Sequence, residues 1–422
     1  GLKVKAENAM NIVFDLNGHS ITGSALSATT PALYIVSACG RDMSGSVKII
    51  NSSTEKAAIS AKLPLQIFGS SYADEVRVEI DENVTLEVLE GGTNAIKMVQ
   101  SAAYLVATEH TKTFYKNGGF MTTVNDEERI HEELSSAQKF SKNVKLLNDF
   151  ATSSYLKIWD SWGAVTLDLD GHTYKSTAKV NMFELQEGAN ITFKKGTLKG
   201  SGDCVIGMPY NNSTLTLDSV AVENTGNFGI ATNGTTTNQT VTINNSTIKV
   251  PNGMGVYFPS TGKLTINGGS IEANTGVQIC AGSLEITGNP TIKATATAAE
   301  AISSGSILDG AAVSIVGGRS GYGAMGQVTI DSGSFTSASG IEAVQAYTVN
   351  SNNQKADWTD AEAKVNISGG SYSTPVRENL CAEGFVPVTK ANADGLYEVT
   401  KDTSEAKIGD TKFATLADAL KV

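Results

Sequence analysis

The stretch Lys263–Gly276, KLTINGGSIEANTG, decides the fold class, because close variants of it recur along the second half of the chain. It places an apolar residue at every second position, then a turn of Asn and Gly, then a second apolar pair. The other copies are TLTLDSVAVENTG (Thr214–Gly226), TVTINNSTIKVPNG (Thr240–Gly253), SLEITGNPTIKA (Ser283–Ala294), QVTIDSGSFTSASG (Gln327–Gly340) and KVNISGGSYSTP (Lys364–Pro375). A period of two predicts short strands, and the turn residues end them.

The spacing of these copies indicates how the strands are arranged. Leu217, Ile243, Ile266 and Ile286 mark equivalent positions that are 26, 23 and 20 residues apart. A repeat of roughly 22 residues with two or three strands matches one coil of a parallel β-solenoid. We therefore predict an all-β chain folded as a right-handed, single-stranded parallel β-helix, with the handedness that crossover connections favour. One inward row is expected to hold Leu217, Ile243, Ile266, Ile286, Ile330 and Ile367.

Composition supports an all-β chain and argues against several classes of protein. The 422 residues include 42 glycines, only 18% charged residues and 40% hydrophobic residues, which is too apolar for a disordered chain. The 32 basic and 43 acidic residues give a net charge of −11 without a basic block, so nucleic acid is not an expected partner. No apolar run reaches the length of a membrane span.

A longer repeat divides the chain into modules. VFDLNGHSITG (Val13–Gly23) returns as TLDLDGHTYKS (Thr166–Ser176). We predict a first β-helix module at 1–122 that is truncated at its N-terminus, a second at 123–405, and the start of a third module or a C-terminal cap at 406–422. One capping or linking helix is expected near 125–140, with Asn125 as N-cap and Ile130, Leu134 and Ala137 on its apolar face.

These motifs together resemble a known family. NVKLLND (Asn143–Asp149), the D-L-N/D-G-H signature, ISGGSYSTPV (Ile367–Val376), AEGFVPV (Ala382–Val388) and the helix-like FATLADALKV (Phe413–Val422) look like the pectate-lyase-like, right-handed β-helix repeat proteins of bacterial cell surfaces. The resemblance implies an extracellular or cell-surface protein, secreted or surface-attached, of the adhesin type.

Neither the D-L-N/D-G-H copies nor the cysteines predict a metal site. Asn17-Gly18 and Asp170-Gly171 fit tight turns at φ > 0, with His19 and His172 bonded to backbone carbonyls at a coil corner. Cys39, Cys204, Cys280 and Cys381 lie far apart without a CxxC pair. Cys204 and Cys280 follow apolar strand residues and are expected in the core ladder, with a disulfide as the less favoured alternative. No metal and no cofactor are predicted.

Catalytic motifs of this fold are missing from the chain. Polygalacturonase-like hydrolases carry N-T-D, D-D, G-H-G and R-I-K elements, whereas this chain has Asn224-Thr225-Gly226 and none of the other three. Arg319 has no acidic cluster beside it in sequence, as a lyase base would need. A polysaccharide lyase or glycoside hydrolase stays open as the alternative function, because active residues can converge from distant coils.

Aromatic residues are the candidate ligand contacts. Aromatic rings can stack on sugar faces, and the candidates are Trp159, Trp162, Tyr210, Tyr257, Tyr322 and Trp358. The sequence thus predicts a non-catalytic adhesin or stalk whose partner is a polysaccharide or a host surface glycoprotein. It gives no indication of an oligomeric state.

Overall fold

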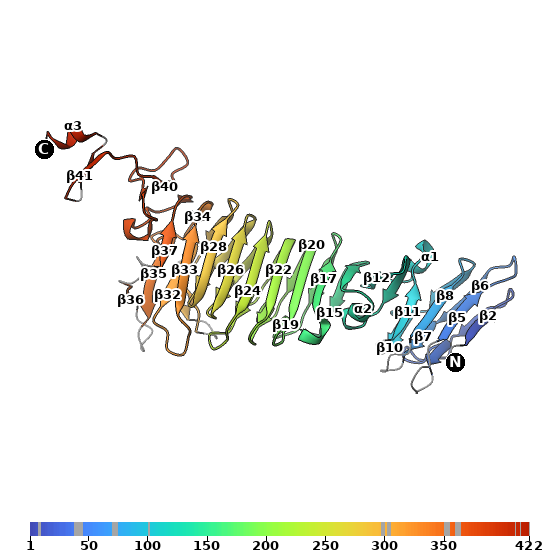
Figure 1. Cartoon of the computed structure of the whole chain (residues 1–422). Coiled ribbons are helices and arrows are strands. Elements are labelled where there is room, and N and C mark those ends of the chain that lie inside the picture. The colour runs from blue at the N-terminus through green and yellow to red at the C-terminus, as the bar shows by residue number, and fades with distance from the viewer. Residues whose placement is uncertain are drawn as a thin grey trace. The chain divides into compact units, whose positions relative to one another are not determined.

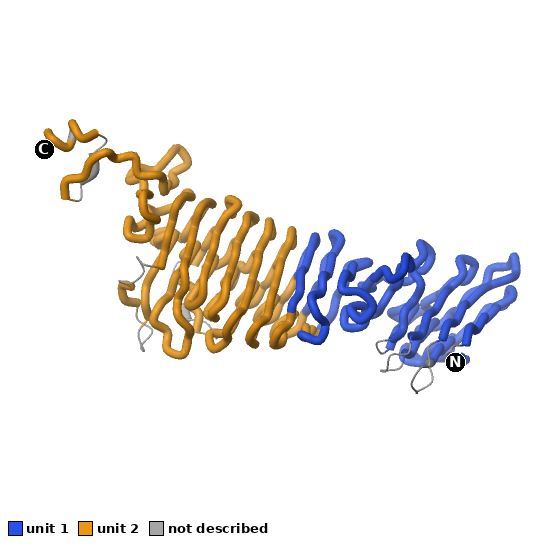
Figure 2. Tube along the Cα trace, in the orientation of Figure 1, with its two compact units in different colours: residues 1–153, 160–176, 190–198 blue, residues 154–159, 177–189, 199–422 orange. Residues whose placement is uncertain are grey.

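The computed structural model describes the chain except for residues 7–9, 38–44, 70–74, 100–101, 297–299, 302–304, 350–354, 359–363, 410, 414 and 422. The described residues are mostly strands, with only short helices, as the composition predicts (Figure 1). Contacts divide the chain into a first unit (1–153, 160–176 and 190–198) and a second unit (154–159, 177–189 and 199–422) (Figure 2). Each unit is described by itself.

The first unit begins with three parallel sheets that the chain visits in rotation. One sheet contains β1 (Leu2–Ala6), β4 (Leu33–Ser37), β7 (Leu65–Phe68) and β10 (Ile96–Val99). The next contains β2 (Asn11–Asp15), β5 (Gly45–Ile50), β8 (Val76–Ile80) and β11 (Ala103–Val106). The third contains β3 (Ile21–Gly23), β6 (Ala57–Ala61) and β9 (Val84–Val88). Alternate residues such as Ile35, Ile49 and Ile59 are buried in the core between these sheets.

The prediction of one helix near 125–140 is correct only for the second half of this segment. Residues 120–131 form a hairpin of β12 (Phe120–Val124) and β13 (Glu127–His131), and the helix α2 spans only Leu134–Phe140. Asn125 and Asp126 have φ of 49° and 64°, which places both in the left-handed region that a two-residue hairpin turn requires. Asn125 is therefore a turn residue and not a helix cap.

Tertiary pairing explains why this segment is extended despite its helix-like sequence. β13 pairs antiparallel with β11, and β12 pairs antiparallel with β14 (Asn143–Leu146). Ile130, Leu134 and Ala137, the predicted apolar face, are all buried. The edge of β14, however, is covered by the strand β12 and not by the helix. A short helix, α1 (Glu109–Lys112), precedes the hairpin.

Parallel pairing resumes after the hairpin in the first unit. β14 pairs with β17 (Ala164–Asp168), β17 with the part of β20 (Asn190–Gly200) that lies in this unit, and β15 (Phe150–Thr152) with β18 (Thr173–Ser176). The 3-10 turn η1 (Asp160–Trp162) precedes β17.

The second unit also stacks parallel strands in rows. The row that carries the site runs through β16 (Leu156–Ile158), β19 (Asn181–Leu185), β21 (Cys204–Met208), β23 (Phe228–Thr232), β25 (Thr247–Phe258), β27 (Ser270–Ile279), β32 (Val313–Gly317) and β35 (Val344–Val349). A second row runs through β22 (Thr214–Asn224), β24 (Gln239–Asn244), β26 (Gly262–Asn267), β28 (Gly282–Thr287), β33 (Met325–Ile330) and β37 (Val365–Ile367). A third row runs through β22, β25, β27, β29 (Thr291–Ala294), β34 (Ser334–Thr336) and β38 (Ser371–Tyr372).

The predicted inward row is confirmed residue by residue. Leu217 pairs with Ile243, Ile243 with Ile266, and Ile266 with Ile286. Ile286 continues to Ile330 and Ile330 to Ile367. All six side chains are at most 1% exposed. The strand phase derived from the sequence is therefore correct.

Short antiparallel strands and one 3-10 turn complete the second unit. They are β30 (Glu300–Ala301), β31 (Ile307–Leu308), β36 (Lys355–Asp357), η3 (Glu378–Leu380), β39 (Phe385–Pro387), β40 (Tyr397–Lys401), β41 (Ala406–Ile408) and β42 (Thr411–Phe413). The helix α3 (Leu416–Ala419) follows Thr415, as the FATLADALKV pattern predicts. Within the described part of the chain, no helix has the length and apolarity needed to cross a membrane.

Candidate functional site

The two D-L-N/D-G-H copies form turns, as predicted. Asn17 and Gly18 have φ of 44° and 79°, and the backbone N–H of Asn17 donates to Asp15 Oδ1 at 2.9 Å. The second copy repeats this geometry at Asp168, Asp170 and Gly171. The side chain of His172 differs from expectation, because its Nδ1 lies 3.6 Å from Asp149 Oδ1 and not on a backbone carbonyl. The described residues contain no group of three metal-ligating side chains.

The six aromatic residues that were predicted to contact a ligand differ in exposure and in position. Trp159 is 46% exposed and Tyr210 41% exposed, whereas Trp162 is buried. Trp358 is half-buried, and its ring lies against Gly317, where a Cβ would approach it to 2.9 Å. Tyr257 and Tyr322 come together, with their hydroxyl oxygens 2.9 Å apart.

Tyr257 and Tyr322 both line one hollow of the second unit, which we call the aromatic pocket. Its volume is about 350 Å³, within the usual range for a small-ligand site. Phe228, Met208 and Pro209 add apolar walls, and the rings of Phe228 and Tyr257 stack with centroids 5.7 Å apart. The polar groups that line it are Asn181, Asp203, Cys204, Thr232 and Asn233. Phe228 and Tyr257 are each only 1% exposed, so the half-buried ring of Tyr322 is the aromatic group that this pocket presents beside a few hydrogen-bonding groups.

Small residues in register create this hollow. Along the outward side of the row of strands, Glu184 pairs with Gly207, Gly207 with Ala231, and Ala231 with Tyr257. Side chains at equivalent positions of stacked strands lie side by side. A Cβ on Gly207 would lie 2.6 Å from the Asn181 side chain, so Asn181 packs over Gly207. The small side chain of Ala231 leaves the space beside Tyr257.

Close contacts at two glycines position Tyr322. A Cβ on Gly234 would lie 2.2 Å from Cε1 of the Tyr322 ring, so the ring packs directly on the Gly234 backbone. A Cβ on Gly305 would lie 3.1 Å from the Tyr322 hydroxyl and 3.4 Å from Arg319 Nη1. Gly305 also has a positive φ of 74°, which favours glycine. Larger residues at Gly234 or Gly305 would displace Tyr322.

The buried thiols and the Tyr257 hydroxyl in and next to the pocket stay protonated at neutral pH. Burial raises the pKa of the Cys280 thiol to about 12 and also raises the pKa of Cys204. Burial likewise raises the pKa of Tyr257. Both cysteines are free and buried, as predicted, and they lie in a hydrophobic core cluster with Phe228, Met254 and Tyr257. Cys381 is half-buried, and Cys39 lies outside the described residues.

A buried carboxylate anchors the segment next to this cluster. Asp309 is 1% exposed, and its Oδ2 accepts from the hydroxyls of Ser314 at 2.7 Å and Tyr347 at 2.8 Å. Its Oδ1 accepts from the Ala311 backbone N–H at 3.2 Å and the Thr275 hydroxyl at 3.2 Å. Because both oxygens are already occupied, Asp309 holds this segment on β32 and β35.

A second aromatic patch extends from the rim of the pocket. Tyr155 and Trp159 are each 46% exposed, and Lys157 Nζ lies 5.9 Å from both ring centroids. Lys157 Nζ is 3.6 Å from Glu184 Oε1, and Glu184 Oε2 accepts from Asn181 Nδ2 at 3.2 Å. Asn181 lines the aromatic pocket, so polar contacts connect Trp159 to it.

No protein-family model, curated protein or solved structure matches this chain.

Most of the pocket could not be found from sequence. Phe228 and Asn181 lie on different strands, Asp203 directly precedes a third strand, and no linear motif joins them. One usable signal was the presence of Gly207 and Ala231 at outward positions of apolar strands, since a glycine inside a strand often marks a close approach.

Proposed function

We propose that the chain is a right-handed parallel β-helix of the pectate-lyase-like surface-protein type, serving outside the cell as a non-catalytic adhesin or stalk that binds glycans. The parallel-strand rows visited in rotation and the inward row from Leu217 to Ile367 support the β-helix. The single observation that carries the binding function is the aromatic pocket, in which the half-buried Tyr322 lies beside the buried ring of Tyr257 and the small residue Ala231.

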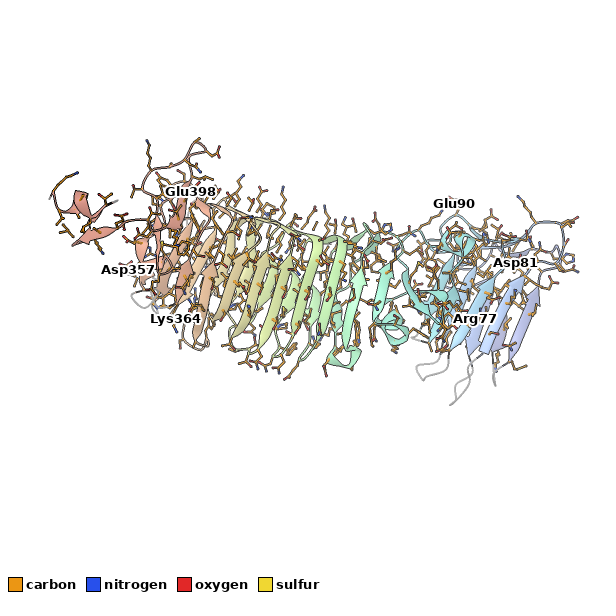
Figure 3. The ribbon with its side chains drawn as sticks, turned by 45° about the horizontal axis from the view of Figure 1, so that its top comes forward. Arg77, Asp81, Glu90, Asp357, Lys364 and Glu398 are labelled. Carbon is orange, nitrogen blue, oxygen red and sulfur yellow. The ribbon has the colours of Figure 1, made fainter. Side chains whose placement is uncertain are left out.

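The chemistry of this pocket suits a sugar. Aromatic rings stack on the apolar faces of pyranoses, while Asn181, Asn233 and Asp203 offer donors and acceptors to hydroxyl groups. Asp203 is the one carboxylate among the described residues that line it, and its Oδ1 already accepts from Asn227 Nδ2 at 2.7 Å. Figure 3 shows acidic and basic side chains on both units, an arrangement that favours neither nucleic acid nor a polyanion.

Glycan-array binding tests the proposal. The wild type should bind a defined set of glycans, and Tyr322→Ala should weaken that binding at least tenfold by removing a stacking face. Ala231→Leu should do the same by filling the pocket floor. Tyr210→Ala is the matched control, because Tyr210 is exposed and does not line the pocket.

A polysaccharide-cleavage assay separates this proposal from its alternative. The wild type should release neither reducing ends nor unsaturated products from neutral and uronic-acid polysaccharides. Cleavage that Tyr322→Ala abolishes would replace the proposal with a lyase or hydrolase. Retention of full glycan binding by both pocket variants would refute the assignment of the site.

A further inference from the structure

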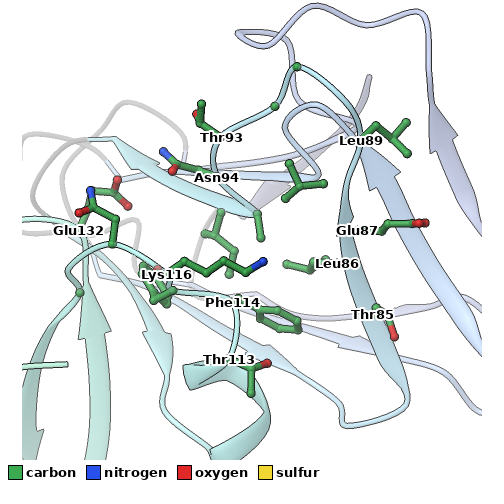
Figure 4. Close-up of a pocket in the computed structure, with 18 of the residues that line it drawn as sticks. Thr85, Leu86, Glu87, Leu89, Thr93, Asn94, Thr113, Phe114, Lys116 and Glu132 are labelled. Carbon is green, nitrogen blue, oxygen red and sulfur yellow. The ribbon is translucent and has the colours of Figure 1, made fainter. Parts of the chain in front are cut away.

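The first unit contains a hollow of about 700 Å³ beside an open strand edge. The strand is β9, the last of the sheet formed by β3, β6 and β9. Among the described residues, β9 pairs with β6 on one side and with no strand on the other. Figure 4 shows the hollow with Leu86 directed toward Phe114 and Lys116, and with Thr85 and Glu87 on the opposite side of the strand.

Hydrogen bonds show which backbone groups face this open edge. The N–H of Leu89 donates to the Ala61 carbonyl of β6, so residues 85, 87 and 89 point toward β6. The intervening residues Val84, Leu86 and Val88 then point away from β6, because backbone groups alternate sides along a strand. His110 Nε2 lies 2.8 Å from the Val84 carbonyl oxygen on this outer side. The N–H and C=O groups of Leu86 and Val88 are left facing the hollow.

The neighbouring edges are capped in ways that β9 is not. The Met98 N–H on β10 reaches Glu132 Oε2 at 3.4 Å, and β11 is paired with β13. On β15, the Ala151 N–H donates to Asn117 Oδ1 at 2.8 Å. Next to these strands, and among the described residues, the edge of β9 at Leu86 and Val88 is open, as are the edges of β1, β2 and β3 in the first coil of this unit.

We propose that this edge binds an extended peptide segment of a partner protein as an added β-strand. An exposed strand edge is a template for such pairing, in which main-chain bonds give affinity and alternate side chains give specificity. The hollow of about 700 Å³ is lined by β9 on one side and by residues of the segment 113–119 on the other, which is where an added strand would lie.

The side chains around the edge define the sequence that fits. Guest side chains on the inner side would meet Leu86, Phe114 and Tyr115, so these should be apolar. Guest side chains on the outer side would lie beside Thr85 and Glu87. Among the described residues that line the hollow, Glu87 and Glu90 are acidic and Lys116 is the single cation. We therefore expect the bound peptide to place a lysine or arginine on this outer side. The partner segment therefore alternates apolar residues with polar and basic ones.

A defined peptide tests the proposal. The probe is fluorescein-labelled Val-Thr-Val-Lys-Val-Thr-Val-amide, measured by fluorescence anisotropy with the whole chain. A version methylated at alternate backbone nitrogens cannot form main-chain bonds along one edge and should bind at least tenfold more weakly. A version with glutamate in place of lysine should also bind more weakly, and this difference should shrink at high salt.

A pair of protein variants tests the same proposal independently of the modified peptides. Val88→Pro removes an outward N–H without removing a bond to β6 and should weaken binding at least tenfold, whereas Val88→Ala keeps the N–H and should bind like the wild type. Equal binding of the methylated and unmethylated peptides would overturn the proposal, as would the absence of saturable binding by the probe. Self-association of the wild type in sedimentation velocity that Val88→Pro abolishes would also overturn it, since a second copy would then occupy the edge.

Discussion

At the scale of single residues, inward and outward positions of one strand have very different energetic roles. Ile266 is 1% exposed in the inward row, and Thr265 is half-buried on the other side of β26. Truncating a buried isoleucine to alanine costs about 2–5 kcal/mol from lost burial and an unfilled cavity. We expect Ile266→Ala to lower the denaturation midpoint clearly and Thr265→Ala to change it little, as followed by circular dichroism in urea. Similar losses for both variants would contradict the assigned strand phase.

A second residue-scale prediction concerns pH. Burial raises the pKa of Glu132 to about 7, from the ordinary value of 4.5 for a glutamate. The folded state then holds more protons than the unfolded state between these values, so the contribution of Glu132 to stability is present at low pH and falls as pH rises through this window. Glu132→Gln keeps an acceptor for the Met98 N–H but cannot ionise.

Thermal melts from pH 4 to 8 check this expectation. Relative to the wild type, Glu132→Gln should gain up to about 3 kcal/mol of stability at pH 8 and little at pH 4. Glu90→Gln, at an exposed position, serves as the control. A constant difference between Glu132→Gln and the wild type at all pH values would show that ionisation of Glu132 is not responsible.

At the scale of elements, the hairpin and α2 protect a strand edge. β12 covers the edge of β14, and α2 packs Leu134 and Ala137 against this hairpin. Leu134→Lys would bury a charge at a position that is 1% exposed, so we expect α2 to detach, the hairpin to loosen and β14 to become available for edge pairing. Light scattering should show aggregation of this variant but not of Lys139→Ala, which changes an exposed residue of the same helix. A monomeric Leu134→Lys protein with an unchanged melting temperature would refute the protective role.

At the scale of the whole molecule, stability should depend on stacked strands and not on a bound ion. The described residues contain no cluster of metal-ligating side chains, and both D-L-N/D-G-H copies form turns. A structural metal would stabilise the native state through binding, so its removal would lower the melting temperature. We expect EDTA to leave the melting temperature of the chain within one degree or so of its original value. A fall of several degrees, restored by calcium or zinc, would reveal a metal site.

The sequence by itself determined the strand phase and the turns. Period-two alternation placed Leu217, Ile243 and Ile266 in one inward row, because a buried position in a stacked strand tolerates only apolar side chains. Asn17-Gly18 and Asp170-Gly171 could be assigned as turns because few residues adopt a positive φ. Tertiary structure decided the remainder. Glu127–His131 became a strand because β11 supplied a pairing partner, against a local pattern that favoured a helix. Tyr257, Tyr322 and Gly207 formed one pocket because strands that are distant in sequence stack in register, a relation that no local motif records.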